Sequence, residues 1–370
     1  MSSIPSPRTD ADPAPTPAAL RSQISIRVLD REGYRQRLPA WEAFMTNEGR
    51  TRLSLHPRWL SVLERGLGHR PFVIEAVEGE KVQGLLPLVL IQSLLFGRFL
   101  VGLSYLNYGG VVCPDPETAR RLIDAGIELA ERLKVRHLEL RHEEPVEHPR
   151  MEMASGMKVH MRRALPKTTE ALWAELGPKV RNQVRKGEKH ALRVDWGGVD
   201  LLGDFYEVFS RNMRDLGTPV YGRGLFRAIL ESFPDEAELC VVRLEGAPIA
   251  ASLLLHGRES SEVPSAGSLR RHNPTCANML MYWNLLVRAV ERGQTEFDFG
   301  RSSPESPTYK FKVQWGARPF PAHWSYHVRS GDRSAMRPDN PKNQRLIAVW
   351  RRLPVPLTRL IGPSVVRGIP

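Results

Sequence analysis

Hydrophobic positions in the first half of the chain follow a simple order of elements. Apolar runs at 72–77 and 82–91 predict two strands, and the turn between them contains Gly79. Apolar residues at helical spacing then predict a helix at 117–133, and a further apolar run predicts a strand at 135–140. The first half therefore predicts a hairpin that is followed by a helix and a strand.

The second half repeats this order with little sequence in common. Strands are predicted at 239–243 and 248–255, with a turn at Glu245-Gly246, and a helix at 276–292 precedes a strand at 295–299. Agreement in order and spacing indicates an internal duplication, which bears more on the fold than any local propensity does.

The remaining pattern predicts helices before and between the repeats. Thr168 or Thr169 can cap a first helix, and Gly177-Pro178 ends it and starts a second helix. The apolar stretch 84–106 contains Pro87 and Arg98, so it is interpreted as buried strands and not as a membrane span. The other predicted elements are a strand at 24–30 and helices at 31–47, 56–66, 198–217 and 223–232.

Polar chemistry follows the last predicted strand of the second repeat. Phe297 and Phe299 alternate with Asp298, so one face of the strand is apolar and the other presents a carboxylate. Gly300 breaks the strand, and two prolines are expected to hold an open turn that delivers Tyr309, Lys310, Phe311 and Lys312. Such a position beyond a strand end is common for active sites in α/β architectures.

These residues carry a family resemblance. The run FDFGRS, then Tyr-x-Phe-Lys and Trp-Gly-Ala-x-Pro, resembles the carboxy-terminal signature of FemAB-like acyltransferases, nearest to the branch associated with PEP-CTERM and exopolysaccharide systems. The segment 178–186 (PKVRNQVRK) and the helix residues Asn278 and Tyr282 extend the likeness over about residues 25–365. One departure is the turn at 304–307, which is Pro-Glu-Ser-Pro where relatives have a Gly-Thr-Gly-like sequence.

The resemblance implies an α/β (α+β) fold of two tandem GNAT-like domains, each a mixed, mostly antiparallel sheet flanked by helices. We expect a disordered tail at 1–22, an N-terminal domain at 23–165, a C-terminal domain at 166–330 that begins with a basic helical segment, and a basic amphipathic extension at 331–370.

The implied activity is N-acyl transfer to an amine. By resemblance Lys312 stabilises the oxyanion, while Tyr309 can relay a proton and Asp298 can orient or deprotonate the amine. Asn278, Tyr282, Arg301 and Lys310 are expected to bind substrate. The donor is aminoacyl-tRNA or acyl-CoA, with no tightly bound cofactor, and the acceptor is an amine-bearing sugar or a lipid-linked glycan, in exopolysaccharide or envelope assembly.

Net charge is concentrated in two segments. The whole chain carries +12, of which 179–193 supplies +5 and 329–370 supplies +7. On the helix of the first segment like charges recur every four residues, an arrangement that favours an anionic ligand such as a phosphate. The residues expected to bind it are Lys179, Arg181, Asn182, Arg185 and Lys189.

The carboxy-terminal segment 342–353 combines basic residues with an apolar stripe that includes Trp350. Such a helix suits an anionic membrane surface, and it equally suits docking on the protein body. Three widely spaced cysteines and an amino terminus without a signal-peptide pattern favour a cytoplasmic protein, with peripheral contact at the inner membrane face left open.

His137, Glu139 and His142 do not share one strand face, so no metal site is expected.

Two other interpretations of the function stay open. The alternatives to the main hypothesis are an acyl-CoA-dependent acetyltransferase acting on an amino sugar, and a non-catalytic RNA- or membrane-binding protein with a decayed site.

Overall fold

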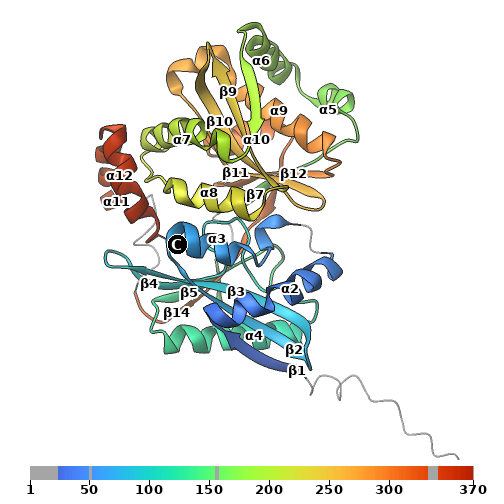
Figure 1. Cartoon of the computed structure of the whole chain (residues 1–370), viewed down its shortest axis with the longest axis vertical. Coiled ribbons are helices and arrows are strands. Elements are labelled where there is room, and N and C mark those ends of the chain that lie inside the picture. Colours follow the sequence, from blue (N-terminus) through green and yellow to red (C-terminus); the bar gives the residue numbers. More distant parts are fainter. Residues whose placement is uncertain (1–23, 50–51, 155–157, 332–340, 370) are drawn as a thin grey trace, which may run out of the picture.

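Two seven-stranded sheets, each mixed and mostly antiparallel, form the fold in a computed structural model that describes residues 24–49, 52–154, 158–331 and 341–369 (Figure 1). In spatial order the first sheet comprises β1 (Ile24–Leu29), β2 (Arg70–Glu78), β3 (Lys81–Ser93), β4 (Gly97–Val101), β5 (His137–His142), β14 (His323–Val328) and β6 (Glu152–Ala154). The second comprises β13 (Arg318–Pro321), β7 (Val159–Ala164), β12 (Glu296–Ser302), β11 (Ser260–Ser268), β10 (Ala247–His256), β9 (Ala237–Leu244) and β8 (Arg193–Gly197). The predicted tandem architecture is confirmed.

Helices cover both faces of each sheet. The inner helices, which face the other domain, are α2 (Arg31–Asn47), α3 (Trp59–Leu67), α7 (Leu202–Leu216) and α8 (Arg223–Ser232). The outer helices are α4 (Pro116–Arg132) on the first sheet and α9 (Ala277–Glu291) on the second, where α5 (Thr169–Glu175) and α6 (Pro178–Lys189) pack against α9. The remaining helices are α10 (Pro307–Gln314), α11 (Pro341–Trp350) and α12 (Val355–Val366), with short 3₁₀ turns at Leu53–Leu55, Val199–Leu201 and Arg270–Thr275.

One hydrophobic core joins the two domains. It contains the inward residues of both sheets together with the apolar faces of α2, α3, α7 and α8. At the contact between α3 and α8, a Cβ on Gly66 would lie 2.7 Å from Leu225 Cα, so a larger residue would force these helices apart. Because β2 and β3 are buried on both faces, their sequences are continuously apolar, which explains the membrane-like hydropathy of this region. No helix in the described part of the chain is long and apolar enough to cross a membrane.

Each sheet contains one parallel pair that opens into a fork. In the first sheet β4 and β5 pair only at Leu100–Leu138 and Val101–Glu139. In the second sheet, β11 and β12 pair from Ser260–Glu296 to Glu262–Asp298 and then separate. Beyond that point β11 stays paired with β10, and β12 stays paired with β7. The connecting helices α4 and α9 make the corresponding crossovers, as the repeated sequence pattern predicts.

The two domains exchange strands near their boundary. Strand β7, which precedes residue 165, lies in the second sheet, and β14, which follows the second repeat, pairs with β5 and β6 in the first sheet. Sheet membership therefore crosses the predicted division at 165/166 in both directions, and the domain limits stay a prediction.

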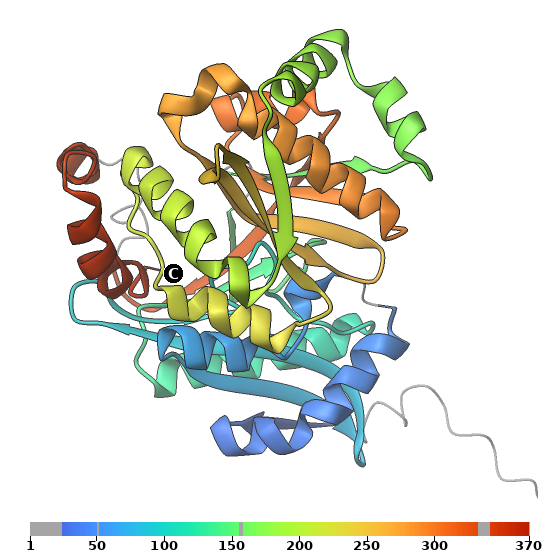
Figure 2. The ribbon, with the colours of Figure 1, turned by 45° about the horizontal axis from the view of Figure 1, so that its top comes forward.

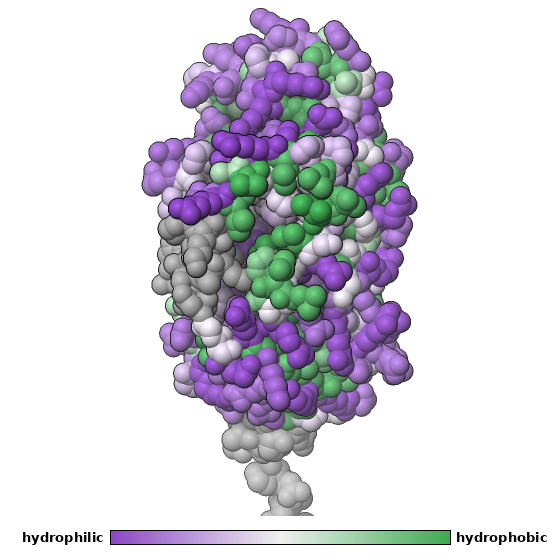
Figure 3. Space-filling view, turned by 90° about the vertical axis from the view of Figure 1, so that its left-hand side faces the viewer, coloured by the Kyte–Doolittle hydropathy of each residue, from purple (hydrophilic) through white to green (hydrophobic). Residues whose placement is uncertain are grey.

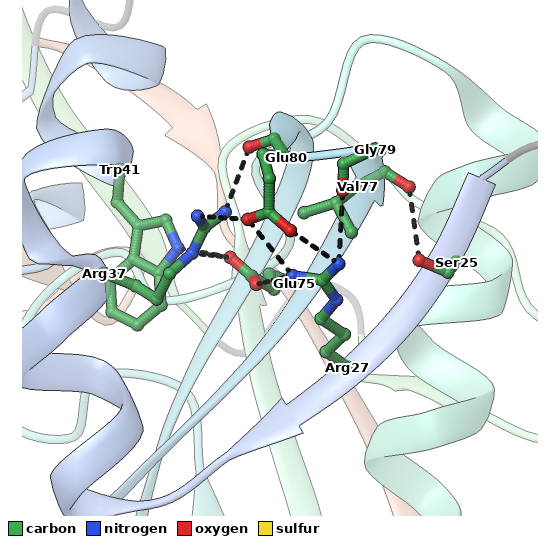
Figure 4. A network of polar contacts seen from close by, with 8 residues as sticks. All are labelled: Ser25, Arg27, Arg37, Trp41, Glu75, Val77, Gly79 and Glu80. Carbon is green, nitrogen blue, oxygen red and sulfur yellow. Dashed lines mark hydrogen bonds and ion pairs between the residues drawn. The ribbon is translucent and has the colours of Figure 1, made fainter.

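A buried carboxylate fixes α2 on the first sheet (Figure 4). Glu75 is fully buried in the apolar β2 strand, where it accepts hydrogen bonds from Trp41 Nε1 at 2.8 Å and Arg37 Nε at 3.1 Å. Arg27 lies 3.8 Å from the other oxygen and also pairs with Glu80 at the hairpin turn. A buried charge is tolerated only with such partners, so Glu75 ties β1, the β2–β3 hairpin and α2 together.

The carboxy-terminal helices dock on the body of the protein at α7 (Figure 2). Arg359 of α12 donates to Ser210 Oγ and pairs with Glu207, and Arg214 of α7 donates to the Leu353 carbonyl. On α11, Ile347 faces Gly217, whereas Leu346 and Val349 remain exposed. Both predicted alternatives for this segment thus keep a physical basis, because one part of its apolar surface docks and another faces solvent.

The loop after β4 requires glycine at its closest crossing. A Cβ on Gly109 would lie 1.9 Å from the Gly102 carbonyl oxygen, a clash that no side-chain movement can relieve. We expect Gly109→Ala to lower the free energy of unfolding by about 1–3 kcal/mol, the usual cost of overpacking. In the control Gly224→Ala the added Cβ meets no atom within 4 Å, so urea unfolding should change little. Equal stability of both variants would contradict the tight crossing.

Candidate active site

Lys312 lies on helix α10, which follows the predicted turn and was not itself predicted. Ser306 caps α10, its Oγ accepting from the Tyr309 amide at 3.2 Å, and Pro307 occupies the first helical turn. Proline at this place starts a helix because its missing N–H would have no partner there. The open turn that was predicted between the two prolines is limited to the residues before Pro307, and Tyr309–Lys312 form a helix that the sequence pattern did not predict.

The Lys312 ammonium is held at the bend at Gly300, within β12. Its Nζ donates to the Gly300 carbonyl at 3.1 Å and to the Arg301 carbonyl at 2.9 Å. Only 8% of the residue is exposed, and this burial lowers the pKa of Lys312 to about 8, with Asp298 opposing the shift. An ammonium has three donors, and the third has no partner among the described residues, so it can donate to a ligand.

Asp298 is fully buried at the contact between the domains. Tyr108 of the first domain donates its hydroxyl to Asp298 Oδ2 at 2.6 Å, and the Gly300 amide donates to Oδ1 at 2.7 Å. Both carboxylate oxygens are thus engaged, and Gly300, with φ of 75°, makes the bend that points its carbonyl at Lys312. This geometry suits a group that positions the bend.

Two arginines surround this pair. Arg52 lies 4.7 Å above the Tyr108 ring and 3.6 Å from Asp298, and it also pairs with Glu143 and Glu296. Arg162 of β7 donates to the Tyr108 hydroxyl at 3.1 Å and pairs with Glu143 at 3.0 Å. The pKa of Arg52 is raised, because the neighbouring acidic groups outweigh the opposing effect of its burial. The Arg52 guanidinium therefore stays charged although it is largely removed from water.

Asn107 enters the fork between β11 and β12. Its amide donates to Glu262 Oε1, and it lies beside Gly300. Burial, and secondly the charge of Asp298, raise the pKa of the Glu262 carboxyl. A carboxyl group with a raised pKa can accept a proton near neutral pH, so Glu262 joins the candidate groups.

A pocket of about 290 Å³ opens beside this fork, between the domains. Its wall is largely apolar, from α7, α8 and β11, with Tyr105 and Arg301 at the polar end. Arg301 stacks on Trp324 at 5.0 Å, and burial lowers its pKa to about 10. Because the Arg301 carbonyl also holds Lys312, the pocket and the ammonium meet at one residue. A second pocket, of about 680 Å³, lies near the start of β12 and includes Arg162, Trp315 and Phe320.

The other residues predicted from the motif surround β12 without all converging. Tyr282 stacks on Phe299 at 5.9 Å, and burial raises its pKa to about 12. Tyr309 packs against the core of the second domain, and its hydroxyl has no hydrogen-bond partner in the described chain. Asn278 is half-buried at the start of α9, whereas the Lys310 ammonium is exposed, 3.7 Å from Glu305. The structure thus gathers Lys312, Asp298 and Arg301, and leaves Lys310 apart.

The basic helix lies against the start of α9. Gly187 of α6 fits against Leu280, and a Cβ at its position would lie 3.4 Å from the Cys276 carbonyl oxygen. Arg185 stacks on Trp173 at 5.5 Å, while the side chains of Lys179, Arg181, Asn182 and Lys189 make no hydrogen bond or ion pair within the described residues. The predicted anion-binding residues therefore share one helix with free donors.

From the sequence, Asn273 would cap the α9 helix and Pro274 would occupy its first turn, and this prediction is wrong. Asn273 and Pro274 lie in the 3₁₀ turn at Arg270–Thr275, and α9 begins at Ala277, whose amide donates to Thr275 Oγ1 at 3.3 Å. Cys276 has φ of 57°, a left-handed conformation that separates the two helices and moves the start of α9 beyond the predicted cap.

Several residues of the site were not found from the sequence. Arg52 and Tyr108 belong to the first domain and meet Asp298 only through domain packing. Arg162 and Glu262 lie opposite Asp298 on the neighbouring strands β7 and β11, which strand pairing brings together. The polar sequence of β11 offers no strand pattern by which Glu262 could have been placed beside Asp298. Within the described residues no group of three His, Cys, Asp or Glu side chains forms a metal-binding cluster.

Known proteins share this fold. Residues 178–312 match the family described as "Acetyltransferase (GNAT) domain", a segment that contains the fork, Asp298 and Lys312. No curated protein matches the chain in sequence.

Solved structures resemble both domains together. FemX superposes with a TM-score of 0.57 and 15% identity, covering 80% of this chain and 93% of its own. L-PGS from Bacillus licheniformis superposes with a TM-score of 0.52 and 12% identity, covering 85% of this chain and 95% of its own. A tandem GNAT protein from the clavulanic acid biosynthesis pathway superposes with a TM-score of 0.52 and 9% identity, covering 83% of this chain and 100% of its own. The chain therefore has a GNAT-like tandem fold, and the match to the GNAT family model lies within its second half.

The buried ammonium gives a pH-dependent prediction. Lysine has an ordinary pKa of 10.5, and the folded state lowers that of Lys312 to about 8, so the unfolded chain binds this proton more tightly between those pH values. Folding below pH 8 therefore carries the full cost of the buried charge, which disappears as the pH rises towards 10.5. We expect the free energy of unfolding of the wild type, relative to Lys312→Met, to increase by up to ~3 kcal/mol over this range. Urea unfolding of both proteins at several pH values measures this difference in the free energy of unfolding. A difference that stays constant with pH would show that Lys312 has the pKa of an ordinary lysine.

Proposed function

We propose that the protein is an N-acyltransferase whose reaction takes place at the fork of the second domain. The observation that carries this proposal is the Lys312 ammonium, which two carbonyls fix with one donor left over. One of these carbonyls belongs to Arg301, which also lines the interdomain pocket. The fork of the first domain is a poor alternative, because its own loop fills it: the Gly109 amide donates to the Arg141 carbonyl at 2.8 Å.

The proposed step is attack of an amine on an acyl carbonyl. The amine nitrogen forms the new C–N bond, the tetrahedral intermediate carries negative charge on oxygen, and the bond to the leaving group then breaks. Lys312 Nζ–H is oriented before the charge develops, which is the condition for effective oxyanion stabilisation. Glu262 is the buried carboxyl that is best suited to accept the amine proton, and the thiolate of a thioester donor leaves with its electron pair.

Asp298 takes a positioning role in this proposal. Its carboxylate accepts from Tyr108 and from the Gly300 amide, and it thereby fixes the bend whose carbonyl holds Lys312. Tyr309 stays a candidate for proton relay to the leaving group, since its hydroxyl has no partner within the described residues.

The family match favours acyl-CoA as the donor. Coenzyme A brings phosphates, and the free cations of α6 stand beside the amino-terminal end of α9, where amides and the helix dipole also attract anions. Aminoacyl-tRNA, the other predicted donor, gains no support from this family, although the same cations would suit its phosphates.

For the acceptor we propose an amine-bearing molecule with an apolar portion. The interdomain pocket is lined mainly by aliphatic and aromatic side chains, and it reaches Arg301 next to Lys312. An amino sugar on a lipid-linked glycan has this combination, and it agrees with the proposed place in exopolysaccharide or envelope assembly.

The first test concerns Lys312. With acetyl-CoA and a panel of amino sugars, we expect Lys312→Met to lower kcat/KM by about a hundredfold, the usual effect of removing one oxyanion donor. Release of free thiol measures the reaction. A matched control is Lys81→Met, an exposed lysine at the β2–β3 turn. Normal turnover by a folded Lys312→Met protein would remove this residue from the mechanism.

The second test concerns α6. Reversing Arg181 and Lys189 to Glu should weaken coenzyme A binding about tenfold or more and flatten its salt dependence, because the substitutions remove charge-assisted hydrogen bonds to phosphate. As a control, Arg120→Glu with Arg132→Glu places the same charge change on exposed positions of α4. Calorimetric titration at two salt concentrations provides the comparison. If both double variants bind coenzyme A as the wild type does, α6 is only a solvated surface.

A further inference from the structure

The β3–β4 hairpin ends in two exposed leucines. Leu94 is fully exposed and Leu95 is 76% exposed at a tip that projects beyond the first sheet. The tip is rigidly supported, because Phe96 packs with the small core of Ile91, Phe99 and Val101 beneath it. A protein in water gains nothing from presenting two large apolar side chains on a convex turn, so the tip suggests a partner.

A second exposed apolar group lies on α12, whose end contacts this hairpin. Leu357 and Leu360 face outward from α12, and Leu360 is 75% exposed. The end of α12 contacts the hairpin, since a Cβ on Gly368 would lie 2.5 Å from Ser93 Oγ and 3.2 Å from Phe96. Figure 3 looks onto this side of the molecule and shows hydrophobic side chains gathered in the middle, with hydrophilic ones above and below. We call Leu94, Leu95, Leu357 and Leu360 the hairpin–α12 surface.

Unpaired cations stand at the base of the hairpin. Arg136 donates to the Phe96 carbonyl at 2.8 Å, and its backbone is hydrogen-bonded to those of Arg98 and Arg329. Lys134 and Arg367 are exposed nearby, at the turn before β5 and at the end of α12. None of these five side chains forms an ion pair with another described residue. Positive charge thus surrounds an apolar protrusion.

Two backbone amides of the tip are hydrogen-bonded within the turn. Ser93 Oγ accepts hydrogen bonds from the Leu95 amide at 3.3 Å and from the Phe96 amide at 3.2 Å. Moving an unpaired amide out of water costs free energy, because it loses its hydrogen bonds to water. The amides of Leu95 and Phe96 already have a partner within the protein, so this cost is lower for the turn.

We propose that the hairpin–α12 surface docks on an anionic lipid bilayer. Leucines on a convex tip can enter a fluid interface, whereas a protein partner would have to provide a matching cavity. The surrounding arginines and lysine supply the complement to acidic head groups. The surface thus combines shallow apolar insertion with electrostatic attraction, which gives reversible peripheral binding.

The test is sedimentation of the full chain with lipid vesicles. Vesicles of phosphatidylcholine mixed with phosphatidylglycerol should carry the protein into the pellet, and pure phosphatidylcholine should not. We expect Leu94→Asp with Leu95→Asp to weaken this binding by at least about tenfold, because two apolar side chains no longer enter the bilayer. Arg98→Glu with Arg136→Glu should weaken it by about fivefold per residue and reduce its salt dependence. The control Val28→Asp changes an exposed valine on β1, away from the hairpin.

Thermal unfolding shows whether each variant is folded, and the substituted leucines lie on an exposed turn outside the hydrophobic core. No pelleting of the wild type at low salt would overturn the proposal. So would equal binding of both vesicle types, or unchanged binding of the Leu94/Leu95 variant. A concentration-dependent dimer in light scattering that this variant abolishes would assign the surface to a second copy of the chain, and that result would also overturn it.

Discussion

The buried Asp298 carboxylate is the interaction on which the arrangement of the two domains depends. It lies at the end of the paired part of β12, and its partners Tyr108 and Arg52 both come from the first domain. Removing an ion from water costs several kcal/mol unless such partners replace its hydration. The carboxylate is therefore tolerated only when the domains are docked, and it then sets the bend at Gly300 that directs two carbonyls at Lys312. The contact between the domains and the position of the Lys312 ammonium thus depend on the same carboxylate.

The duplicated forks have diverged in what fills them. In the first domain the loop after β4 returns on itself, and Gly109 pairs with β5 beyond the fork. The preceding residues of the same loop, Asn107 and Tyr108, reach Glu262 and Asp298 in the second domain. The first repeat has thereby become a support for the second. This division agrees with a GNAT family match that is confined to residues 178–312.

Elements with a strong local signal could be predicted from the sequence, whereas those that depend on domain packing could not. The helices 31–47 and 223–232 and both hairpins follow from apolar periodicity and turn residues, and α2 and α8 have the predicted limits. Strand β11 (SSEVPSAGS) escaped prediction, because its polar residues face the interdomain cluster and the pocket. Helix α10 has almost no amphipathic pattern, and its start is set by Ser306 capping. The Tyr108–Asp298 contact joins residues 190 positions apart, a separation that no local pattern reveals.

Tyr105 connects the proposed chemistry with the proposed lipid contact. Its ring lines the interdomain pocket, and its hydroxyl donates to the Arg367 carbonyl at 2.8 Å, at the end of α12. The same helix end contacts the β3–β4 hairpin, so Tyr105 links the pocket to the elements that carry the hairpin–α12 surface. If this surface rests on a bilayer, the pocket lies near the head groups, where the amine of a lipid-linked acceptor is found. A soluble acceptor would gain nothing from that placement, because diffusion brings it to a pocket on any side of the molecule. Docking and acceptor class are therefore linked through the position of α12, although each can be tested without the other.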